Sequence, residues 1–313
     1  MSRNSSAGNE RCCETAARLA FGDGGSRMSQ GRWGAGIKAV LPLVLFLSPF
    51  LGLCQRVVSL APGVTEIVFA LGRGDSLVGI TTYCDYPPEV KRLARVGGFL
   101  DINLEALVAL APDIVIAYPE HEEKIVRLKG RIKTVIVRHG RLRDLLDSIL
   151  RIGRVLDRRS EAETLVSSIE RTLCRLASQA QGKRKLPVLF IAGRNAGELK
   201  NMFVVGKNDF LSEILEICGG KNAYGGAIDY PSMSLESVIS LQPEFIFELS
   251  SHFEGLDDRR IFDLWRPYVM VPAVAKKQVR IIRDSFWLRP GPRVGRIAEE
   301  LARMLAAAGS PGG

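Results

Sequence analysis

"NLEALVALAPDIVI" (residues 103–116) and "SLESVISLQPEFIF" (residues 234–247) are two copies of one pattern, separated by 131 residues. Each copy begins with a residue that caps helix N-termini well, continues as a helix, and passes through a proline into a buried strand. Just upstream, "GGFLD" (97–101) matches "GGAID" (225–229) in outline. The chain therefore contains two versions of one helix–strand unit. Their identical pairs are Leu104/Leu235, Glu105/Glu236, Leu110/Leu241 and Pro112/Pro243.

Short apolar runs alternate with helical patterns along the rest of the chain. Continuous apolar strands between helices are typical of parallel sheets covered on both faces, so we expect two Rossmann-like α/β lobes. Helices are expected at about 64–71, 104–110 and 121–128. The expected strands are "RVVSL" (56–60), "LVGI" (77–80), "DIVIA" (113–117), "TVIV" (134–137), "VLFIAG" (188–193), "FIFEL" (245–249) and "VRIIR" (279–283).

A long helical stretch separates the two lobes. Leucine and isoleucine recur at helical spacing over 142–150 and again over 165–176. Ser160 followed by Glu163 has the spacing of a capping box and predicts a helix start there. We therefore expect a long α-helix that bridges the lobes, with a ligand cleft between them. The predicted organisation is an N-terminal extension with a signal peptide (1–54), an N-terminal lobe (55–158), the bridging helix (159–182) and a C-terminal lobe (183–313).

Composition and motifs exclude several functions. The net charge is +9, but residues outside 1–54 carry a surplus of only six positive charges, and no basic run is interleaved with aromatics. Nucleic acid is therefore not expected as a partner. No nucleotide-binding, nucleophile-elbow or metal-ligand spacing is present, so we expect neither an enzyme nor a metal site. The three histidines, His121, His139 and His252, are expected at the surface, with His121 near enough to the cleft to be an alternative axial ligand for a bound metal.

The N-terminal segment predicts export. Residues 37–53 hold an uncharged apolar run that is short for a membrane span and suits a signal peptide. Cleavage after Cys54 is the first interpretation, and acylation of Cys54 as a lipid anchor is the second. Both place the mature chain outside the cytoplasm, in the periplasm, and either Met1 or Met28 can be the start. Cys84, Cys174 and Cys218 remain after cleavage, and buried free thiols are favoured over a disulfide.

Aromatic residues gather on the loops that follow the predicted strands. The carboxyl ends of parallel strands meet at one edge of a sheet, and ligands bind outside that edge. Six loop aromatics at one edge predict a cleft for a large, flat or partly apolar ligand. They are Tyr83, Phe99, Tyr118, Tyr230, Phe286 and Trp287.

The ordered motifs "YCDYPPE" (83–89), "FVVGKNDFLSEILEICGGKNAY" (203–224) and "FWLRPGPRV" (286–294), with the repeat, resemble the periplasmic substrate-binding proteins of ABC importers. The resemblance is to the class with a helical backbone, and within it to the cobalamin-binding members. It implies a monomeric binding protein without a cofactor that delivers cobalamin to a permease dimer; haem and ferric siderophores are the alternatives. It adds Phe203 to the expected ligand contacts, and Arg289 or Arg194 would serve an anionic ligand.

Glu105 and Glu236 match the family glutamates that dock onto arginines of the permease. Without the resemblance, a favourable interaction with the helix dipole explains both residues equally well. The sequence departs from the family where Phe99, Tyr118 and Tyr230 replace tryptophan, which leaves the tetrapyrrole undecided. An exported α/β enzyme using the same cleft, or a sensor without a transporter, are the alternatives from other functional classes.

Overall fold

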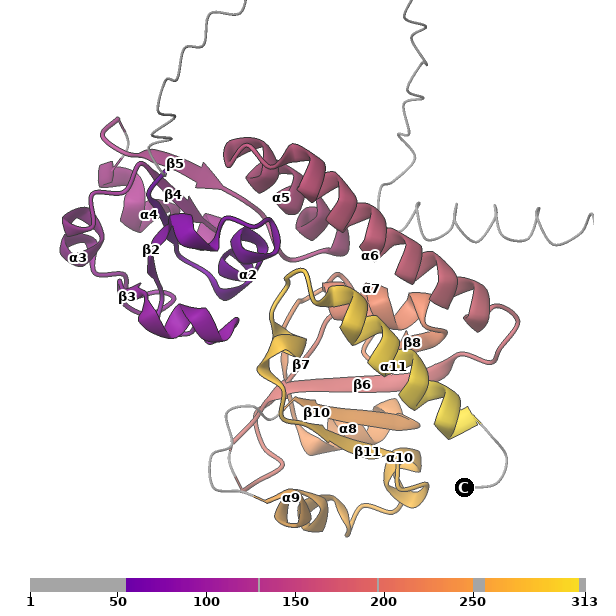
Figure 1. Cartoon of the computed structure of the whole chain (residues 1–313). Coiled ribbons are helices and arrows are strands. Elements are labelled where there is room, and N and C mark those ends of the chain that lie inside the picture. Colours follow the sequence, from indigo (N-terminus) through magenta and orange to yellow (C-terminus); the bar gives the residue numbers. More distant parts are fainter. Residues whose placement is uncertain (1–54, 129, 196, 250–256, 310–313) are drawn as a thin grey trace, which may run out of the picture.

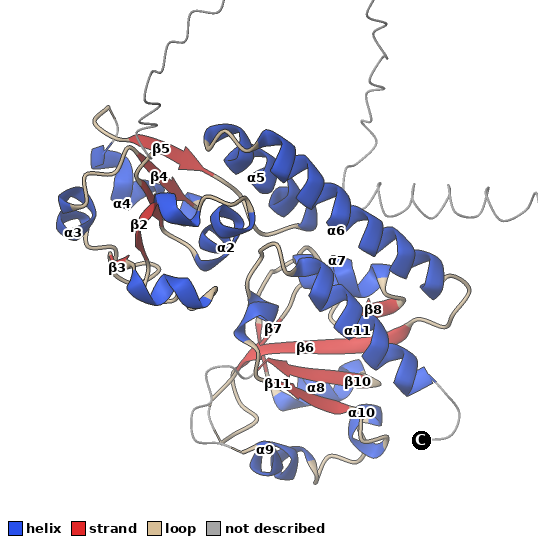
Figure 2. Cartoon of the chain, viewed as in Figure 1, coloured by secondary structure: helices blue, strands red, loops and turns tan. Residues whose placement is uncertain are grey.

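The structure is a computed structural model that describes residues 55–309, except 129, 196 and 250–256. Two α/β lobes lie side by side, and a pair of long helices runs along one side of both (Figure 1). Helices pack around the sheet of each lobe (Figure 2). The expected arrangement of two lobes joined by a helical connector is therefore confirmed.

The N-terminal lobe is built on a five-stranded parallel sheet of order β3-β2-β1-β4-β5. Strand β4 is buried along its whole length, as its unbroken apolar run predicts for a strand covered on both faces. The strands are β1 (Val57–Ser59), β2 (Leu77–Ile80), β3 (Ala94–Arg95), β4 (Ile114–Ala117) and β5 (Lys133–Ile136), and the helices are α2 (Pro62–Ala70), α3 (Leu104–Ala109) and α4 (Glu122–Ile125).

The C-terminal lobe has a mixed sheet of order β11-β10-β6-β7-β9, with β8 also paired to β6. Strands β6, β8, β10 and β11 pair in parallel as expected, but the chain reverses after β6 and returns as β7, antiparallel to it. Asn195 and Lys200 close this turn, where the Asn195 amide donates to the Lys200 carbonyl at 3.2 Å. The strands are β6 (Leu186–Gly193), β7 (Met202–Val204), β8 (Gly220–Asn222), β9 (Ser232–Met233), β10 (Phe245–Leu249) and β11 (Val279–Ile282), and the helices are α7 (Phe210–Ile217), α8 (Leu235–Leu241), α9 (Asp258–Trp265), α10 (Pro272–Ala275) and α11 (Val294–Gly309).

The connector is a helical hairpin of α5 (Leu142–Val155) and α6 (Arg159–Ala180). Gly153 lets the two helices approach closely, since a Cβ there would lie 2.4 Å from the Cβ of Ala162. The predicted capping box is wrong. Helix α6 already begins at Arg159, so Ser160 lies inside the first turn, and Glu163 pairs with Arg159 at 2.7 Å. The apolar face of α6 is buried at the predicted spacing, at Ala162, Val166, Ile169, Leu173 and Leu176.

The internal repeat folds as two equivalent units, α3 with β4 and α8 with β10. Asn103 accepts a hydrogen bond from the amide of Ala106 at 2.8 Å, and Ser234 accepts one from the amide of Ser237 at 3.3 Å, so both predicted caps are confirmed. The copies also share a backbone conformation that the sequence does not predict. Ala111 and Gln242, each directly before the repeat proline, have positive φ values of 41° and 46° although neither is glycine.

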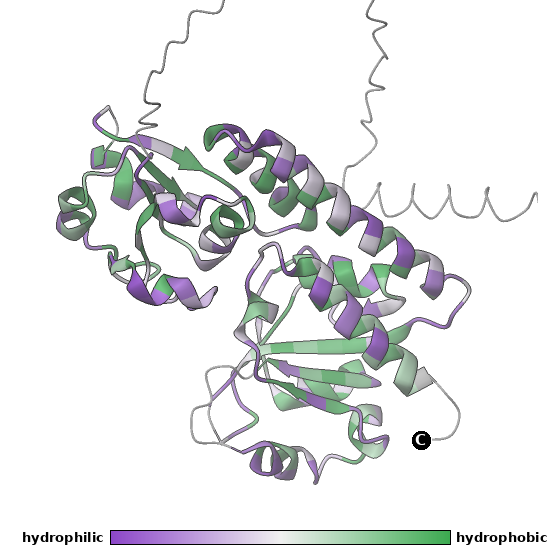
Figure 3. Cartoon of the chain, viewed as in Figure 1, coloured by the Kyte–Doolittle hydropathy of each residue, from purple (hydrophilic) through white to green (hydrophobic). Residues whose placement is uncertain are grey.

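Three hydrophobic clusters organise the described core. The largest runs from β1 and α2 of the N-terminal lobe through α5, α6 and α7 to α11 of the C-terminal lobe. The other two each cover one further face of a single sheet. The strands β4, β6 and β10 are mostly apolar, while α5 and α6 alternate apolar and polar residues (Figure 3). The two lobes therefore share one core on the side of the helical hairpin.

The cysteines of the described residues are free thiols, as expected, and Cys84 and Cys218 are buried, whereas Cys174 is half-buried. Burial raises the pKa of Cys218 to about 12, which leaves its thiol protonated and unreactive. Within residues 55–309 no helix combines the length and the apolar composition needed to cross a bilayer. The predicted signal segment and Cys54 lie outside the described residues.

A fully buried ion pair stands at the carboxyl end of β6 and β10. The guanidinium of Arg194 donates two hydrogen bonds to one Glu248 oxygen, at 3.0 and 3.2 Å, and one to the other at 3.1 Å. The indole of Trp265 donates to the same carboxylate at 2.6 Å. Arg194 also donates to backbone carbonyls in the turn that leads to β7. This cluster connects β6, β10, α9 and the turn between β6 and β7. The guanidinium of Arg194 is therefore fully engaged and does not contact a ligand.

We predict that Glu248→Ala lowers the free energy of unfolding of the C-terminal lobe by about 3–5 kcal/mol, because it leaves the Arg194 charge buried without a counter-charge. Urea titration followed by circular dichroism and tryptophan fluorescence measures this loss, since both described tryptophans, Trp265 and Trp287, lie in that lobe. The matched control is Glu299→Ala, which breaks the exposed pair with Arg175 and costs less than about 1 kcal/mol. Equal urea midpoints for the two variants would show that the buried pair does not stabilise the lobe.

Candidate ligand-binding cleft

The two lobes face each other across a cavity of about 790 Å³. The N-terminal lobe contributes loops that follow β1, β3, β4 and β5. The C-terminal lobe contributes the segment before α7, the loop between β8 and β9, and the loop after β11. This is the edge at which α/β sheets bind ligands. The lining residues are Pro62, Gly63, Phe99, Tyr118, Pro119, Glu120, Arg138, His139, Gly140, Arg141, Asp144, Asn208, Asp209, Phe210, Ala227, Asp229, Tyr230, Leu288, Arg289 and Pro290.

A second hollow of about 980 Å³ lies at the other end of the C-terminal lobe, between the last turns of α6 and α11. It is bordered by the starts of β6, β10 and β11, which are the amino ends of those strands. Its most buried acid, Glu244, is already shared by Arg184 and Lys276. The cavity between the lobes is therefore the candidate ligand site, although it is the smaller of the two.

The N-terminal wall of the cleft is a cluster of aromatic rings in stacked, tilted and edge-to-face contacts. The ring of Tyr118 lies 4.0 Å from that of His139 and 6.2 Å from that of His121, measured between centroids. Phe99 meets Tyr118 edge to face at 6.3 Å. Burial is the main reason that the pKa of Tyr118 is raised, so its hydroxyl stays protonated. The cluster offers a largely uncharged, aromatic surface to a ligand.

His121 lies beneath this wall and is 1% exposed, so the expectation of a surface histidine is wrong for it. Its Nδ1 accepts a hydrogen bond from the backbone amide of Tyr118 at 3.0 Å, which places the proton of the neutral ring on Nε2. Burial lowers the pKa of His121. Its Nε2 has no hydrogen-bond partner within the described residues. Those residues also contain no group of three His, Cys, Asp or Glu side chains that would hold a metal ion.

The C-terminal wall carries a hydrogen-bonded pair, Asp209 and Tyr230. The Tyr230 hydroxyl donates to Asp209 at 2.7 Å, and the amide of Leu211 donates to the same carboxyl group at 2.8 Å. Burial raises the pKa of Asp209 to about 6 despite these two donors. The Tyr230 side chain remains 42% exposed, so its ring is held at the hydroxyl end and faces the cleft.

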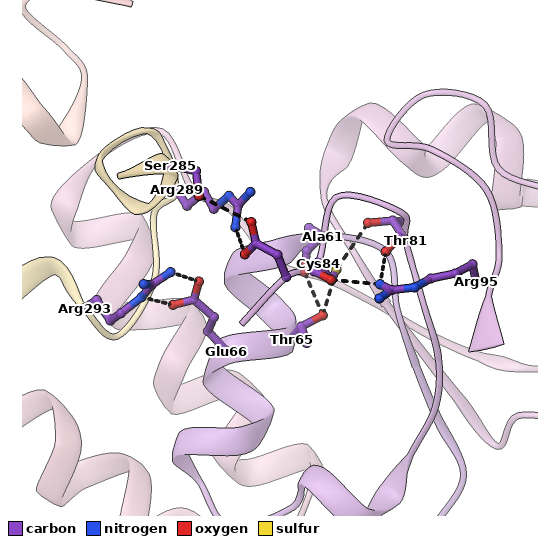
Figure 4. Close-up of polar contacts among 10 residues, drawn as sticks. Ala61, Thr65, Glu66, Thr81, Cys84, Arg95, Ser285, Arg289 and Arg293 are labelled. Atoms are coloured by element: carbon purple, nitrogen blue, oxygen red, sulfur yellow. Dashed lines mark hydrogen bonds and ion pairs between the residues drawn. The ribbon is translucent and has the colours of Figure 1, made fainter. Parts of the chain in front are cut away.

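Ion pairs between the lobes flank the cleft (Figure 4). Arg293, at the start of α11, binds the buried carboxylate of Glu66 in α2 through two nitrogens, with Nε 2.8 Å from the nearer oxygen. Burial raises the pKa of Glu66, while Arg293 opposes this shift. Asp85 pairs with Arg289 and accepts a hydrogen bond from the hydroxyl of Ser285 at 3.4 Å. The segment before α11 is therefore tied to the N-terminal lobe.

The loop that carries Asp85 is fixed from behind by its own lobe. Arg95 donates hydrogen bonds to the carbonyls of Thr81 and Cys84 at 2.9 and 2.8 Å. The hydroxyl of Thr65 lies 3.2 Å from the Cys84 sulfur. These contacts appear together in Figure 4. The loop after β2 is thus a rigid support for the ion pair with Arg289.

A second inter-lobe contact lies at the opposite side of the cleft floor. Glu213 in α7 is buried and accepts hydrogen bonds from Arg141 at 2.8 Å and from the amide of Leu142 at 2.7 Å. The amide of Phe210 donates to the carbonyl of Gly140 at 2.9 Å. Here the carboxylate of the C-terminal lobe caps the start of α5.

The sequence-predicted contacts divide into three groups. Phe99, Tyr118, Tyr230 and Arg289 line the cavity. Tyr83 and Phe203 are 56% and 46% exposed but are not among its lining residues. Phe286 and Trp287 are buried, so the expectation that this pair faces the cleft is wrong.

The reason for the last error is the turn at 285–288. It directs the Trp287 ring into the core, 5.7 Å from that of Phe247, and the indole donates to Glu300 at 3.2 Å. Phe286 lies under the guanidinium of Arg293. Consequently the residues that follow, Leu288 to Pro290, form this part of the cleft wall.

Sequence reasoning missed the polar lining of the cleft. Arg138 to Arg141 follow β5 directly, so the rule that selected Tyr118 after β4 also covers them. Asp209 and Asn208 belong to the motif "FVVGKNDFLSEILEICGGKNAY" (203–224), from which the resemblance gave only Phe203 as a ligand contact. Only aromatic residues were selected from the loops, so residues 138–141 and 208–209 were missed.

Glu105 and Glu236 lie outside the cleft, in the first turns of α3 and α8. Both are exposed and have no ion-pair partner within the described residues. The Ser234 hydroxyl is the main cause that lowers the pKa of Glu236, which keeps it ionised. The two equivalent helices therefore each present one carboxylate to solvent.

Comparison with known proteins gives a consistent result. Residues 57–285 match the family model described as periplasmic binding protein. The vitamin B12-binding protein of Vibrio parahaemolyticus is 31% identical over 243 residues, which cover 76% of this chain and 85% of that protein. That of Pectobacterium carotovorum is 28% identical, over 82% of this chain and 90% of the relative.

Solved structures share the fold. The periplasmic vitamin B12 binding protein of Vibrio cholerae superposes with a TM-score of 0.70 at 26% identity, over 82% of this chain and 98% of that one. The periplasmic heme-binding protein of Roseiflexus sp. RS-1, in its apo form, does so with a TM-score of 0.70 at 25% identity, over 82% and 99%. This chain belongs to the periplasmic binding protein family.

Proposed function

We propose that this chain is the substrate-binding component of an ABC importer, which captures cobalamin in the periplasm and delivers it to a membrane permease. A member of this family is a binding protein and not an enzyme, and what it binds is cargo and not a cofactor. The observation that carries the proposal is the aromatic cavity between two lobes, in a chain whose curated relatives are vitamin B12-binding proteins.

The charge of the cleft supports a ligand with little net charge. Four carboxyl groups line it, Glu120, Asp144, Asp209 and Asp229, against three guanidinium groups, Arg138, Arg141 and Arg289. Asp209 is half protonated near pH 6, and Arg289 is already paired with Asp85. A polyanionic ferric siderophore would need an excess of cations, and Arg194 is buried against Glu248. A corrinoid, large and partly apolar, suits the aromatic wall better.

Haem is the second candidate ligand, because a heme-binding protein shares the fold at the same TM-score as a vitamin B12 binding protein. A tyrosine ligand to haem iron binds as the phenolate. The buried Tyr118 has a raised pKa, which disfavours that form. The aromatic wall alone would hold either tetrapyrrole by stacking, so a direct comparison of ligands decides between them.

We predict that residues 55–313 bind cyanocobalamin more tightly than haem or a ferric siderophore in parallel calorimetric titrations. Phe99→Ala and Tyr230→Ala each weaken cobalamin binding by about tenfold or more, because each removes a ring from one wall of the cleft. Tyr83→Ala and Phe203→Ala are the matched controls, as they remove exposed rings outside the cavity lining. Preferred binding of haem would keep the importer and replace its cargo, whereas no binding of any of the three would refute the proposed function.

The raised pKa of Asp209 predicts a pH-dependent stability. The folded state disfavours the charged form of Asp209. Ionisation of this carboxyl group therefore destabilises the fold fully above about pH 6, and the effect disappears below pH 3.8, the ordinary pKa of the group. We therefore expect Asp209→Asn to unfold at higher temperature than the wild-type protein near pH 8, with a gain that shrinks near pH 4.5. Calorimetric melting temperatures at the two pH values measure this, with the exposed Asp101→Asn as control. A gain of equal size at both pH values would show that the carboxylate charge is not its cause.

Glu105 and Glu236 are the proposed docking residues for the permease. They occupy equivalent positions in the two repeat units, and a dimeric permease offers two equivalent surfaces. We further propose that the chain acts as a monomer, that its lobes and bridging helix follow the boundaries predicted above, and that it reaches the periplasm through the signal segment at 37–53. Lipidation of Cys54 remains the alternative to cleavage after it.

We predict that the double variant Glu105→Arg, Glu236→Arg binds cobalamin normally and no longer stimulates the ATPase of its cognate importer in proteoliposomes. The reversed charges repel the cations that the glutamates would contact. A control pair, Glu163→Arg and Glu216→Arg, changes exposed acids on the helices α6 and α7. Full stimulation by the docking variant would remove these two residues from the proposed interface.

A further inference from the structure

Two large apolar side chains are exposed to solvent on loops that contribute other residues to the cleft. Leu100 is 59% exposed and Ile228 is 66% exposed. They occupy the loops "GGFLD" (97–101) and "GGAID" (225–229), which precede the two repeat helices. Neighbouring residues of both loops line the cavity, but Leu100 and Ile228 do not. We call these two residues the apolar tips.

The loop of the first tip is held rigidly by its backbone. Gly97 has a φ of 100° and pairs with Ile102 in an isolated bridge, and the amide of Gly98 donates to the carbonyl of Asp101 at 3.2 Å. The amide of Thr82 also donates to the Gly97 carbonyl at 2.9 Å. Leu100 therefore projects from a closed turn that the β2 loop supports.

The backbone of the second loop is also held rigidly, but by different contacts. The amide of Gly206 donates to the carbonyl of Asp229 at 2.7 Å, and the amide of Lys207 donates to that of Gly226 at 3.2 Å. The approach is so close that a Cβ on Gly206 would lie 2.2 Å from the carbonyl oxygen of Ile228. Ile228 thus also projects from a fixed backbone.

Each apolar tip is accompanied by acids. Leu100 is followed by Asp101 and lies five residues before Glu105, while Ile228 is followed by Asp229 and lies eight residues before Glu236. All four acids are exposed. The same combination, an apolar side chain on a rigid loop next to carboxylates, therefore occurs once on each lobe. An isolated exposed leucine needs no explanation, but this duplicated arrangement does.

We propose that Leu100 and Ile228 are the apolar anchors of the permease-docking surface, each entering an apolar recess beside a cation on one of two equivalent permease subunits. This inference rests on the proposed function. The acids around the tips select a cationic partner and disfavour the anionic surface of a membrane. The fixed loops lose little conformational freedom when the tips are buried, which favours binding. The occurrence of one tip on each lobe matches a partner with two equivalent halves.

The test compares the double variant Leu100→Ser, Ile228→Ser with the control Val126→Ser, Val269→Ser. The control removes apolar side chains of similar exposure, 48% and 65%, from other parts of the two lobes. Serine adds no charge, so the docking glutamates are undisturbed. Binding to the cognate importer in lipid nanodiscs is measured by interferometry, and cobalamin binding is measured by calorimetry.

We expect the tip variant to bind the importer about 10–100-fold more weakly and to bind cobalamin within threefold of the wild-type affinity. The loss is expected to be the same at low and high salt, because it is apolar, whereas the contribution of Glu105 and Glu236 falls with added salt. The variant Leu100→Met, Ile228→Val keeps the apolar surface and is expected to restore binding. The control variant binds as the wild type does.

Three results would overturn the inference. The first is unchanged importer affinity of the tip variant while the glutamate variant loses it, which leaves the proposed function intact. The second is weakened cobalamin binding with normal docking, which would assign the tips to the ligand. The third is a wild-type dimer that the tip variant abolishes in analytical ultracentrifugation, which would assign them to self-association. Failure of the wild-type protein itself to bind the importer refutes the proposed function together with the inference.

Discussion

The shared hydrophobic core beneath α5, α6 and α11 fixes the angle between the two lobes, and the cleft depends on that angle. In most two-lobed folds each lobe has its own core and a flexible connection. Here a single cluster continues from Val57 in the first strand to Leu305 in the last helix. Opening the lobes widely would expose part of this core to water, at a cost that grows with the apolar area exposed. The cleft is therefore largely formed before a ligand arrives.

Charged contacts between the lobes reinforce the same arrangement. Glu66 is buried, and the paired guanidinium of Arg293 is the main compensation for its charge, with a smaller contribution from Arg289. Separating these two groups would leave a carboxylate in an apolar surrounding, which is more costly than breaking an exposed pair. Glu213 performs a similar role at the start of α5. These pairs explain how a cleft lined by loops keeps its shape.

Sequence patterns predicted the parts of the fold in which local and long-range forces agree. Apolar runs such as 245–249 became buried strands, and the caps Asn103 and Ser234 began the repeat helices. The sequence patterns failed where a side chain was compatible with two locations and tertiary packing determined which one it occupies. Trp287 is equally compatible with a cleft wall and a core, and the core provided both Phe247 and a hydrogen-bond acceptor. Ser160 is not the cap, because Arg158 occupies the N-cap position and the helix begins two residues earlier than the capping box predicts. The polar lining, including Asp209, carries no pattern of its own, since it is assembled from loops of both lobes.

The two repeat units have kept their outer features and changed their inner ones. Capped helices, first-turn glutamates, left-handed residues before the proline and exposed apolar tips all occur in both copies. The cleft walls differ, because one lobe offers a cluster of rings around Tyr118 and the other offers the Asp209–Tyr230 pair. A ligand such as cobalamin has two unlike faces, so equivalent walls would not suit it. A permease built from two equivalent subunits requires instead that the two docking surfaces be alike. The division between a duplicated exterior and a divergent interior agrees with the proposed function, in which one chain holds an asymmetric cargo and approaches a symmetric partner.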